Sequence, residues 1–408
     1  MTIVWIGMVV PSSFSAALAA ADRYVTAQTQ KFQQAVIAAL EGTGENQVRL
    51  VSSPPMTDWS TIVFTGLKRW SHRGDARSDW VVPLVNVIGL KQLCVFLGCF
   101  LFCTAAVWRS GRKGAVIVVG DSYLPHLFAA WLTSRICFIK SIAIVTDLPG
   151  LIAVADPWYK RMLRPLDNFA VKRAIGSMDG LVVLSKHVAV DYFPTKQFMV
   201  MPGIFDLDGV ATGAGERSPA ADEFVVMYSG ALVQEYGIDL LLAAFALLRG
   251  EEYQLWITGK GDSEPAIRAA AHNDKRIHYY GYLSDLEMQA RQQRANVLVN
   301  LRISHQGHAR YSFPSKLFNY MSKERFVLSN RFPSLPDEYA RHLIMLDEET
   351  PSALANVLSR LKAGAYGDMR EFGRSCRDFI LREASAVVQG ARLDQFVREI
   401  GRATPPRT

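Results

Sequence analysis

Short apolar runs recur along the chain and alternate with longer segments whose apolar residues have helical spacing. Before residue 207 the runs are TIVWIGMVV, QVRLVSS, AVIVVG, SIAIVTD, GLVVLS and FMVMPG. After residue 222 they are EFVVMYSG, YQLWITG, RIHYYG, NVLVNL, RFVLSN and HLIML. Strands that are buried on both faces have such a pattern, and their alternation with helices favours parallel, doubly wound sheets. The sequence therefore predicts an α/β fold.

One stretch divides the two series of runs. Residues 207–222, LDGVATGAGERSPAAD, are rich in Gly, Ala and Pro and have no periodicity, which is typical of a linker. We expect two Rossmann-like domains that face a cleft, the first over residues 1–206 and the second over residues 223–385. The tail has helical spacing, and we expect residues 386–408 to return to the first domain.

Composition narrows the possible partners. The net charge is +7, which favours an anionic partner such as nucleic acid, an acidic membrane surface or a phosphate-bearing ligand. The five cysteines form no CxxC pair, which argues against a zinc site or a disulfide framework. The first residues, MTIVWIGMVV, lack a basic region and predict a strand rather than a signal peptide. No nucleic-acid motif occurs, so we expect no nucleic-acid partner.

A region near residues 60–110 predicts contact with a membrane. Residues 93–108, LCVFLGCFLFCTAAVW, carry no charge, and Lys91, Arg109, Arg112 and Lys113 bracket them. A spanning helix needs about 20 apolar residues, so a buried or interface-lying helix is favoured. A tilted span that includes the upstream segment LVNVIGLKQ stays open.

Two basic clusters lie in the same half of the chain. The first has Lys68, Arg69, His72, Arg73 and Arg77 beside Trp59, Trp70 and Trp80; the second has Lys160, Arg161, Arg164, Lys172 and Arg173 beside Met162, Leu163 and Phe169. Solvated basic faces are the simplest interpretation. Tryptophan beside Lys and Arg also suits a membrane interface.

Three loops follow predicted strands of the second domain. Ser229 and Gly230 follow the first strand, Gly259, Lys260 and Gly261 follow the next, and Gly281, Tyr282 and Leu283 follow the third. Open α/β sheets bind ligands at this edge, and a GxG turn lets the backbone approach a phosphate. Taken alone, the first loop is better interpreted as an ordinary tight turn, and a single GxG is weak evidence for a phosphate site. Ser284 and Glu287 form a capping box, which is structural.

The segment YSFPSKLFNYM, residues 311–321, predicts an anion site at a helix start. Pro314 suits the first turn, and Ser312 is a candidate N-cap. Lys316 lies in the first turn, and Arg302 follows the preceding strand, so both could contact a diphosphate. A capped helix with a solvated lysine is the alternative interpretation.

The motifs YSGxL…YGI…LLxAF, IxGxG, RIxxxGxL, VLVNxR and YSFPSKxxxYM resemble the retaining family-4 glycosyltransferases of the GT-B fold. The likeness is to the branch that builds bacterial exopolysaccharides and capsules, and IVTDLPG, LVVLSKHVAVDYFP and VMPGI are similar to that branch too. It covers most of residues 110–345. It implies a nucleotide-sugar donor bound by the second domain, an acceptor bound by the first and no metal or other cofactor.

The resemblance also implies roles for single residues. Lys316 and Arg302 would stabilise the departing nucleoside diphosphate, and Asp147 is the candidate acceptor-side contact. Asn319 stands where the family has a ribose-binding glutamate. The implied donor contacts are Ser229, Gly230, Gly259, Lys260, Gly261, Tyr282, Leu283, Ser312, Phe313, Pro314, Ser315 and Asn319.

The chain departs from the family pattern at several positions. Tyr311 and Asn319 replace the two glutamates of E-x7-E, Glu324 and Phe326 replace the usual Gly and Pro, and Thr146 replaces a common His. Two alternatives stay open: a nucleotide-sugar epimerase on the same fold, and a non-catalytic partner subunit, which the changes at Tyr311, Asn319, Glu324 and Thr146 motivate.

The sequence as a whole predicts a retaining glycosyltransferase of bacterial surface polysaccharide synthesis. We expect it to move a sugar to a lipid-linked saccharide at the cytoplasmic face of the inner membrane, as a peripheral or monotopic protein on an anionic surface. Asp206–Asp208 is interpreted as a turn rather than a metal-binding DxD motif. His305 and His308 are interpreted as loop residues, and His126 either faces the cleft or caps a helix.

Overall fold

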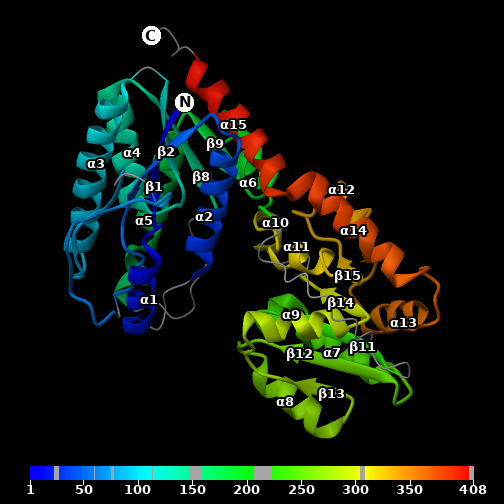
Figure 1. Cartoon of the computed structure of the whole chain (residues 1–408). Helices are drawn as coiled ribbons and strands as arrows, with labels where there is room; N and C mark the ends of the chain where they lie inside the picture. Colours follow the sequence, from blue (N-terminus) through cyan, green and yellow to red (C-terminus); the bar gives the residue numbers. More distant parts are fainter. Residues whose placement is uncertain are drawn as a thin grey trace. The chain divides into compact units, whose positions relative to one another are not determined.

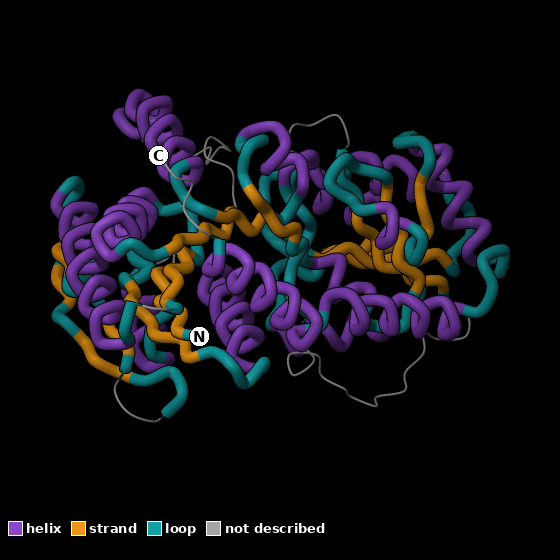
Figure 2. The backbone as a smooth tube through the Cα atoms, turned by 90° about the horizontal axis from the view of Figure 1, so that it is seen from above, coloured by secondary structure: helices purple, strands orange, loops and turns teal. Residues whose placement is uncertain are grey.

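The computed structural model describes residues 1–22, 27–58, 60–74, 78–112, 114–146, 158–205, 223–303 and 308–403. The chain forms two compact units. Unit 1 comprises Met1–Ile204 with Ala386–Thr408, and unit 2 comprises Phe205–Ser385 (Figure 1). Each unit has a mainly parallel sheet between helices, which confirms the predicted α/β class (Figure 2). The linker predicted at residues 207–222 lies outside the described residues.

The sheet of unit 1 has the strand order β10-β9-β8-β7-β1-β2-β5-β4. All its pairs are parallel except β4 with β5. The strands are β1 (Thr2–Gly7), β2 (Gln47–Ser52), β4 (Lys68–Trp70), β5 (Asp79–Val81), β7 (Ala115–Val119), β8 (Lys140–Val145), β9 (Gly180–Val183) and β10 (Gln197–Val200). A separate small hairpin pairs β3 (Phe64–Thr65) with β6 (Leu84–Val85).

Helices cover both faces of this sheet. They are α1 (Ser12–Ala21), α2 (Ala27–Gly42), α3 (Leu90–Ser110), α4 (Leu124–Cys137), α5 (Trp158–Gly176), α6 (Lys186–Tyr192) and α15 (Ala386–Arg402). Ile3 and Trp5 of β1 share one core cluster with α2 and α15. Because successive strand residues point to opposite faces, Val4 and Ile6 point to the other side, where α3 and α4 lie (Figure 1).

Helix α15 completes the core of unit 1 from the far end of the chain. Its apolar residues Leu393, Val397 and Ile400 recur at helical spacing and are buried against β-strands and α2. Gly390 permits close packing, because a Cβ at this position would lie 2.2 Å from the carbonyl oxygen of Ala39. The structure therefore places this helix in unit 1.

The sheet of unit 2 is entirely parallel, with the order β13-β12-β11-β14-β15-β16. The strands are β11 (Phe224–Ser229), β12 (Tyr253–Thr258), β13 (Ile277–Tyr279), β14 (Val297–Asn300), β15 (Phe326–Asn330) and β16 (Ile344–Leu346). The helices are η1 (Gln234–Tyr236), α7 (Ile238–Leu247), α8 (Glu264–Asn273), α9 (Asp285–Arg294), α10 (His308–Tyr311), α11 (Lys316–Met321), α12 (Asp337–Ala340), α13 (Pro351–Lys362) and α14 (Met369–Ala384).

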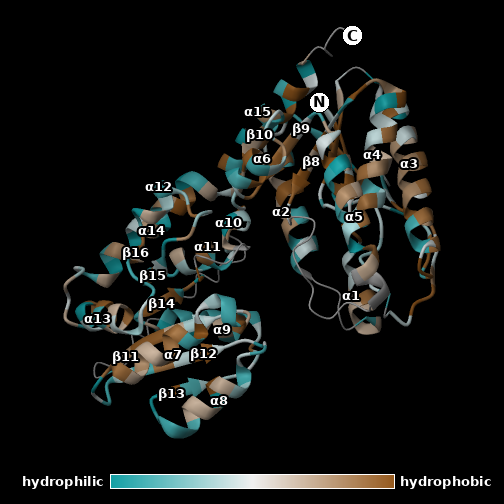
Figure 3. Ribbon diagram, turned by 180° about the vertical axis from the view of Figure 1, so that it is seen from behind, coloured by the Kyte–Doolittle hydropathy of each residue, from teal (hydrophilic) through white to brown (hydrophobic). Residues whose placement is uncertain are grey.

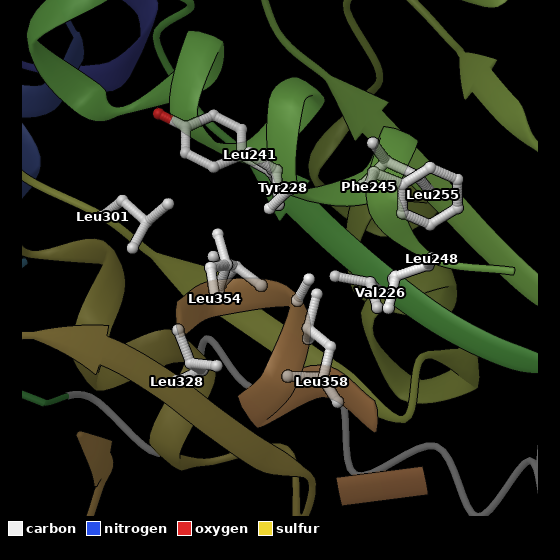
Figure 4. Close-up of a cluster of buried hydrophobic side chains, with 14 of the residues drawn as sticks. Val226, Tyr228, Leu241, Phe245, Leu248, Leu255, Leu301, Leu328, Leu354 and Leu358 are labelled. Atoms are coloured by element: carbon white, nitrogen blue, oxygen red, sulfur yellow. The ribbon is translucent and has the colours of Figure 1, made fainter. Parts of the chain in front are cut away.

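One core cluster of unit 2 lies between the sheet and helices α7 and α13. Figure 4 shows Val226 and Leu255 from the strands close to Phe245 of α7 and Leu358 of α13. The predicted capping box at the start of α9 is confirmed. Its Ser284 hydroxyl accepts from the N–H of Glu287 at 3.4 Å, while the Glu287 carboxylate accepts from the N–H of Ser284 at 3.0 Å.

The first basic cluster is solvated in part, because Lys68, Arg69 and Arg73 are exposed, whereas His72 is paired within unit 1. Lys68 lies 4.4 Å from the ring centroid of Phe14, and Arg69 lies 4.6 Å from that of Trp80. The imidazole of His72 is largely buried between the carboxylates of Glu41 and Asp79. Its nitrogens lie 2.8 Å from Glu41 and 2.6 Å from Asp79. Burial alone would lower the pKa of His72, but hydrogen bonds to Asp79 and then Glu41 raise it to about 9.

Arg73 also donates to Glu41, so His72 and Arg73 pair with acidic groups of unit 1, while Lys68 and Arg69 lie on its exposed surface. Strands β3 to β6 occupy this region, and their two- and three-residue lengths explain why periodicity did not reveal them. Trp59 and Arg77 lie outside the described residues.

Candidate functional site

The candidate site lies at the C-terminal edge of the sheet of unit 2. From β11 the chain proceeds outward to β12 and β13, whereas from β14 it proceeds outward in the other direction to β15 and β16. The neighbours β11 and β14 therefore mark the point where the strand order reverses. In open α/β sheets, a crevice forms outside the carboxyl ends of such strands and binds ligands.

Lys316 of α11 lies over the loop that follows β11. Its Nζ is 3.9 Å from the ring centroid of Tyr228 and 5.7 Å from that of Tyr236. This nitrogen is buried and has no hydrogen-bond partner among the described residues. Burial, and then the charge of Arg302, hold the pKa of Lys316 well below its usual range. The solvated lysine of the alternative interpretation is therefore wrong.

Arg302, directly after β14, supplies a second cation. Its Nη1 donates to the hydroxyl of Ser312 at 2.8 Å, and its guanidinium lies 5.1 Å from the ring centroid of Tyr236. The Nε atom is buried without a partner among the described residues. Burial lowers the pKa of Arg302, although a guanidinium stays protonated in proteins.

The predicted N-cap is wrong. Ser312 accepts the hydrogen bond of Arg302, and Ser315 holds the N-cap position of α11 without a side-chain cap bond. Pro314 consequently precedes the helix instead of occupying its first turn, and its carbonyl accepts from the N–H of Leu317 at 2.9 Å. The site's positive charge therefore comes from Lys316 and Arg302 rather than from a capped helix end.

Asn319 lies almost one turn beyond Lys316, and its Oδ1 is buried and unpartnered. Among the described residues of unit 2, five buried side-chain atoms lack a partner: Gln292 Oε1, Asn300 Oδ1, Arg302 Nε, Lys316 Nζ and Asn319 Oδ1. Asn300 ends β14, and Gln292 contacts the last residue of β11, so these atoms gather at one edge. Buried polar groups are normally satisfied, so the nitrogens of Lys316 and Arg302 are available to donate to an anion, and the amide oxygens are available to accept from hydroxyl groups of a ligand.

The predicted GxG turn has a packing role. Gly259 has φ of 141°, and a Cβ there would lie 1.8 Å from the carbonyl oxygen of Gly230. A Cβ at Gly261 would lie 2.3 Å from the oxygen of Leu232, so both glycines let two loops pack together. An additional phosphate contact at this turn stays a prediction.

The third loop leaves its side chains accessible. Tyr282 is 71% exposed, and the exposed Lys260 lies with its Nζ 5.1 Å from that ring centroid. Leu283 is half-buried beside it. The carbonyl of Gly281 accepts from the N–H of Gly259 at 2.8 Å, which joins this loop to the GxG turn. Tyr282, Leu283 and Lys260 thus remain available to a ligand.

Two predicted donor contacts have side chains committed to packing. Phe313 is buried in an aromatic cluster with Phe318 and Tyr339. Ser229 is buried, and its hydroxyl accepts from Gln292 at 2.9 Å and lies 3.0 Å from the hydroxyl of Tyr320. The side chains of Phe313 and Ser229 therefore do not contact a ligand as the resemblance implied.

Tyr320 is a residue that the sequence analysis missed. Its hydroxyl donates to the carbonyl of Ser229 and accepts from the N–H of Ser229, both at 2.9 Å. These bonds fix α11 to the end of β11 and so hold Lys316 over Tyr228. Tyr320 is part of the motif YSFPSKLFNYM, but residue spacing does not reveal that it bonds to Ser229 at the end of β11.

Asp147 of unit 1 lies outside the described residues, as do Asp206–Asp208 and His305 of unit 2. The side chain of His308 is likewise not described. His126 neither caps a helix nor faces a cleft: it is fully buried, with Nδ1 2.9 Å from Asp121 and Nε2 2.8 Å from the hydroxyl of Ser53. This network lies beside a cavity of about 680 Å³ that Ser53 lines.

Comparisons with known proteins find a related domain and related folds. Residues 223–363, which include Lys316 and Arg302, match the family model described as glycosyl transferases group 1. No curated protein matches the chain.

Solved structures share the fold along nearly the whole chain. A sucrose-phosphate synthase from Thermosynechococcus elongatus is 15% identical, with 98% of this chain and 99% of that chain covered and a TM-score of 0.63. The Anabaena protein HepE in complex with UDP is 10% identical, with 98% and 100% covered and a TM-score of 0.63.

The lipopolysaccharide outer core galactosyltransferase WaaB is 14% identical, with 98% of this chain and 100% of that chain covered and a TM-score of 0.61. At these identities the likeness establishes the fold, which is GT-B with two Rossmann-like domains. Together with the family match, it supports a GT-B glycosyltransferase.

Proposed function

We propose that the protein is a retaining glycosyltransferase that moves a sugar from a nucleotide-sugar donor to a lipid-linked saccharide in bacterial surface polysaccharide synthesis. The observation that carries the proposal is the side-chain nitrogen of Lys316, buried without a partner beside the guanidinium of Arg302. A buried cation without a counter-charge is costly to a protein, so the empty site disfavours the protonated lysine. A nucleoside diphosphate at the same sheet edge would supply the missing negative charge.

The two cations would act on the leaving group. When the bond between the sugar and the β-phosphate breaks, negative charge grows on the diphosphate oxygens. Lys316 and Arg302 are already desolvated and held in place, so little reorganisation is needed when that charge appears. We propose that these side chains perform the stabilisation without a metal ion.

Asn319 would contact the donor's ribose. Its amide can donate to one hydroxyl and accept from another, and its Oδ1 has no other partner among the described residues. On the acceptor side, Asp147 keeps its proposed role, which rests on resemblance. The UDP in the HepE complex supports a nucleotide donor, and the name of WaaB supports a surface-saccharide acceptor.

A calorimetric titration tests the donor site. Purified protein is titrated with UDP, GDP and their hexose conjugates, and we expect one nucleotide class to bind. Asn319→Ala should raise the donor's apparent Kd more than it lowers turnover, which is the pattern of lost uniform binding. EDTA should leave binding and transfer unchanged. The anomeric configuration of the product, read by NMR, tests retention.

The same experiments separate the alternatives. An altered sugar nucleotide formed without any acceptor would indicate the epimerase. A protein that binds no nucleotide sugar and co-purifies with another transferase would be the partner subunit, and the donor site would then be rejected.

A further inference from the structure

Helix α3 is apolar around its whole circumference. Val95, Cys99 and Val107 are buried on the face toward the sheet of unit 1. On the opposite side Leu93, Leu97, Leu101 and Trp108 are between 44% and 62% exposed. Figure 3 shows the hydrophobic colouring of this helix. Its 21 residues would suffice to cross a membrane by length and composition, but its buried side is part of a packed domain.

Helix α5 carries a second exposed apolar stripe. Met162, Leu163, Leu166 and Phe169 are between 54% and 68% exposed. Their spacing of three and four residues places Met162, Leu166 and Phe169 on one face of the helix. Burial on a partner surface would remove this apolar area from water, whereas the isolated unit leaves it exposed.

Helix α4 connects the two stripes, because it contacts both α3 and α5. It exposes Phe128 and Ile136, each at 45%, and the Phe128 ring lies 6.2 Å from that of Phe96 on α3. We define the apolar face as the exposed residues of these helices: Leu93, Leu97, Leu101, Trp108, Phe128, Ile136, Met162, Leu163, Leu166 and Phe169.

Charges around the apolar face are almost all positive. Helices α3 and α4 contain no acidic residue, and Asp167 is the single one in α5. Arg109 and Arg112 stand at the end of α3, Arg135 stands near the end of α4, and Arg173 lies on α5; all four are exposed. Anionic lipid headgroups would match this charge, at about 1 kcal/mol per basic residue.

We propose that the apolar face is a monotopic docking surface for an anionic membrane. Its side chains would enter the boundary between headgroups and acyl chains, while the buried side of α3 stays packed on the sheet. The combination of apolar stripes with exposed arginines, which form no ion pair among the described residues, favours lipid over a second copy of the chain. Two such faces would bring like charges together.

A cavity of about 680 Å³ opens between α3 and α5, lined by residues of both helices. Ile88 and Leu163 line it and are 59% and 54% exposed, so apolar side chains belong to both the cavity and the outer surface. Its polar lining includes the ion pair of Lys91 with Asp58 at 2.9 Å. Tyr123 also lines it, and its buried hydroxyl has no partner among the described residues.

This cavity deepens the proposed function, on which the following step rests. A saccharide headgroup could occupy the polar lining while its lipid remained in the bilayer. Lys91 and Asp58 pair with each other, and Arg164 and Asp167 also line the cavity, so it offers both donors and acceptors to a hydroxyl-rich head. The proposed membrane docking of the apolar face rests on its exposed residues and does not depend on the donor site.

Vesicle sedimentation tests the face. The full chain is mixed with phosphatidylcholine vesicles, with or without phosphatidylglycerol, at low and high salt. We expect tighter binding to the anionic vesicles, weakened but not abolished by salt. Leu97→Glu and Leu166→Glu should each weaken vesicle binding about tenfold or more. Each variant loses an apolar side chain that would enter the lipid, and each adds a negative charge that the anionic surface repels.

Matched controls lie on other exposed apolar residues. Leu286→Glu in unit 2 and Val387→Glu on α15 alter side chains that are 72% and 81% exposed, and both should bind vesicles as the wild type does. Thermal unfolding confirms that every variant is folded. Nucleotide titration of Leu166→Glu should be unchanged, which separates this proposal from the proposed function.

Three results would overturn the proposal. They are no binding of folded wild type to anionic vesicles, equal losses in the control variants, and equal affinity for neutral and anionic vesicles. A wild-type dimer that Leu97→Glu converts to a monomer, without vesicle binding by either, would assign the face to a second copy instead.

Discussion

The two units end their parallel sheets in different ways. In unit 1, the ionisable groups near the ends of β2 and β7 bond to each other, in a chain from Ser53 through His126 to Asp121, which also accepts from Gln33. In unit 2, the cations near the ends of β11 and β14 keep unpartnered nitrogens. The first network is complete within the protein, whereas the second has charge left for a ligand.

The largest expected effect comes from removing the unpartnered lysine, Lys316. Lys316→Ala should reduce turnover by about ten- to a thousandfold, because a preorganised charge-stabilising group is lost. The free energy of unfolding should stay equal or rise, since a buried amine without a partner is also removed. Steady-state kinetics and urea unfolding measure the two effects on the same protein.

Lys323 provides the control for this variant. It is also a buried lysine of unit 2, but its Nζ lies 3.4 Å from Gln289, and burial lowers its pKa to about 8. Lys323→Met should leave nucleotide affinity unchanged. Normal turnover in Lys316→Ala would show that Lys316 does not contribute to catalysis. The proposed difference between the two units would then be rejected.

Breaking the network of unit 1 should have the opposite pattern. His126→Ala leaves the buried Ser53 hydroxyl and the Asp121 carboxylate without a shared partner, so unfolding should cost about 1–3 kcal/mol less. Nucleotide affinity should be unchanged. Urea denaturation measures the free energy of unfolding, and calorimetry measures the nucleotide affinity. An unchanged free energy of unfolding would show that the hydrogen bonds of His126 do not stabilise unit 1.

A pH titration of donor affinity sharpens the comparison further. The groups that face Lys316 are Arg302 and the rings of Tyr228, Tyr236 and Tyr320. Burial raises the pKa of Tyr320 to about 12 and that of Tyr228 above its usual range, so neither carries charge near neutrality. Lys316, with its lowered pKa, is therefore the group expected to titrate.

A bound diphosphate raises the pKa of Lys316, so nucleotide binding should take up a proton. Affinity should then fall as pH rises above the lowered pKa of the empty site, by up to about tenfold per pH unit. Measurements above about pH 7 avoid the second ionisation of the phosphate. Lys316→Arg should abolish the slope, since a guanidinium stays charged. A flat wild-type profile would show that Lys316 is protonated without the ligand.

The smallest effect concerns a backbone feature of unit 2. Glu324 has φ of 54°, a left-handed conformation that favours glycine, the residue that the family resemblance predicts there. Glu324→Gly should relieve about 1 kcal/mol of strain but lose the ion pair with Arg377, which has an N–O distance of 2.8 Å. We expect a slightly higher melting temperature for Glu324→Gly and a lower one for Glu324→Ala, which keeps the strain. Identical values would show that the strain is not felt.

The long strands could be predicted because they are continuous apolar runs buried on both faces. All six runs of unit 2 coincide with strands, and β14 is a typical case, with the run NVLVNL forming Val297–Asn300. The strands β3 to β6 could not be predicted, because each has only two or three residues and several of these are polar or basic.

The site could be predicted only in part. The motif indicated Lys316, Arg302 and Asn319, but their burial depends on Tyr228, Tyr236 and other residues from separate loops. No local pattern reveals such packing. Ser229 shows the converse error, because a serine after a strand has the same sequence signal whether its hydroxyl faces a ligand or bonds to Tyr320.

Helix α15 places a constraint on the order of events during synthesis. The ribosome completes Phe205–Ser385, a continuous segment with its own core, before it releases the residues of α15. The earlier segment Met1–Ile204 must wait for this helix to cover α2. Unit 1 therefore completes its core only when translation ends. Until then, the apolar side chains of Val36 and Leu40 lack their contacts with α15.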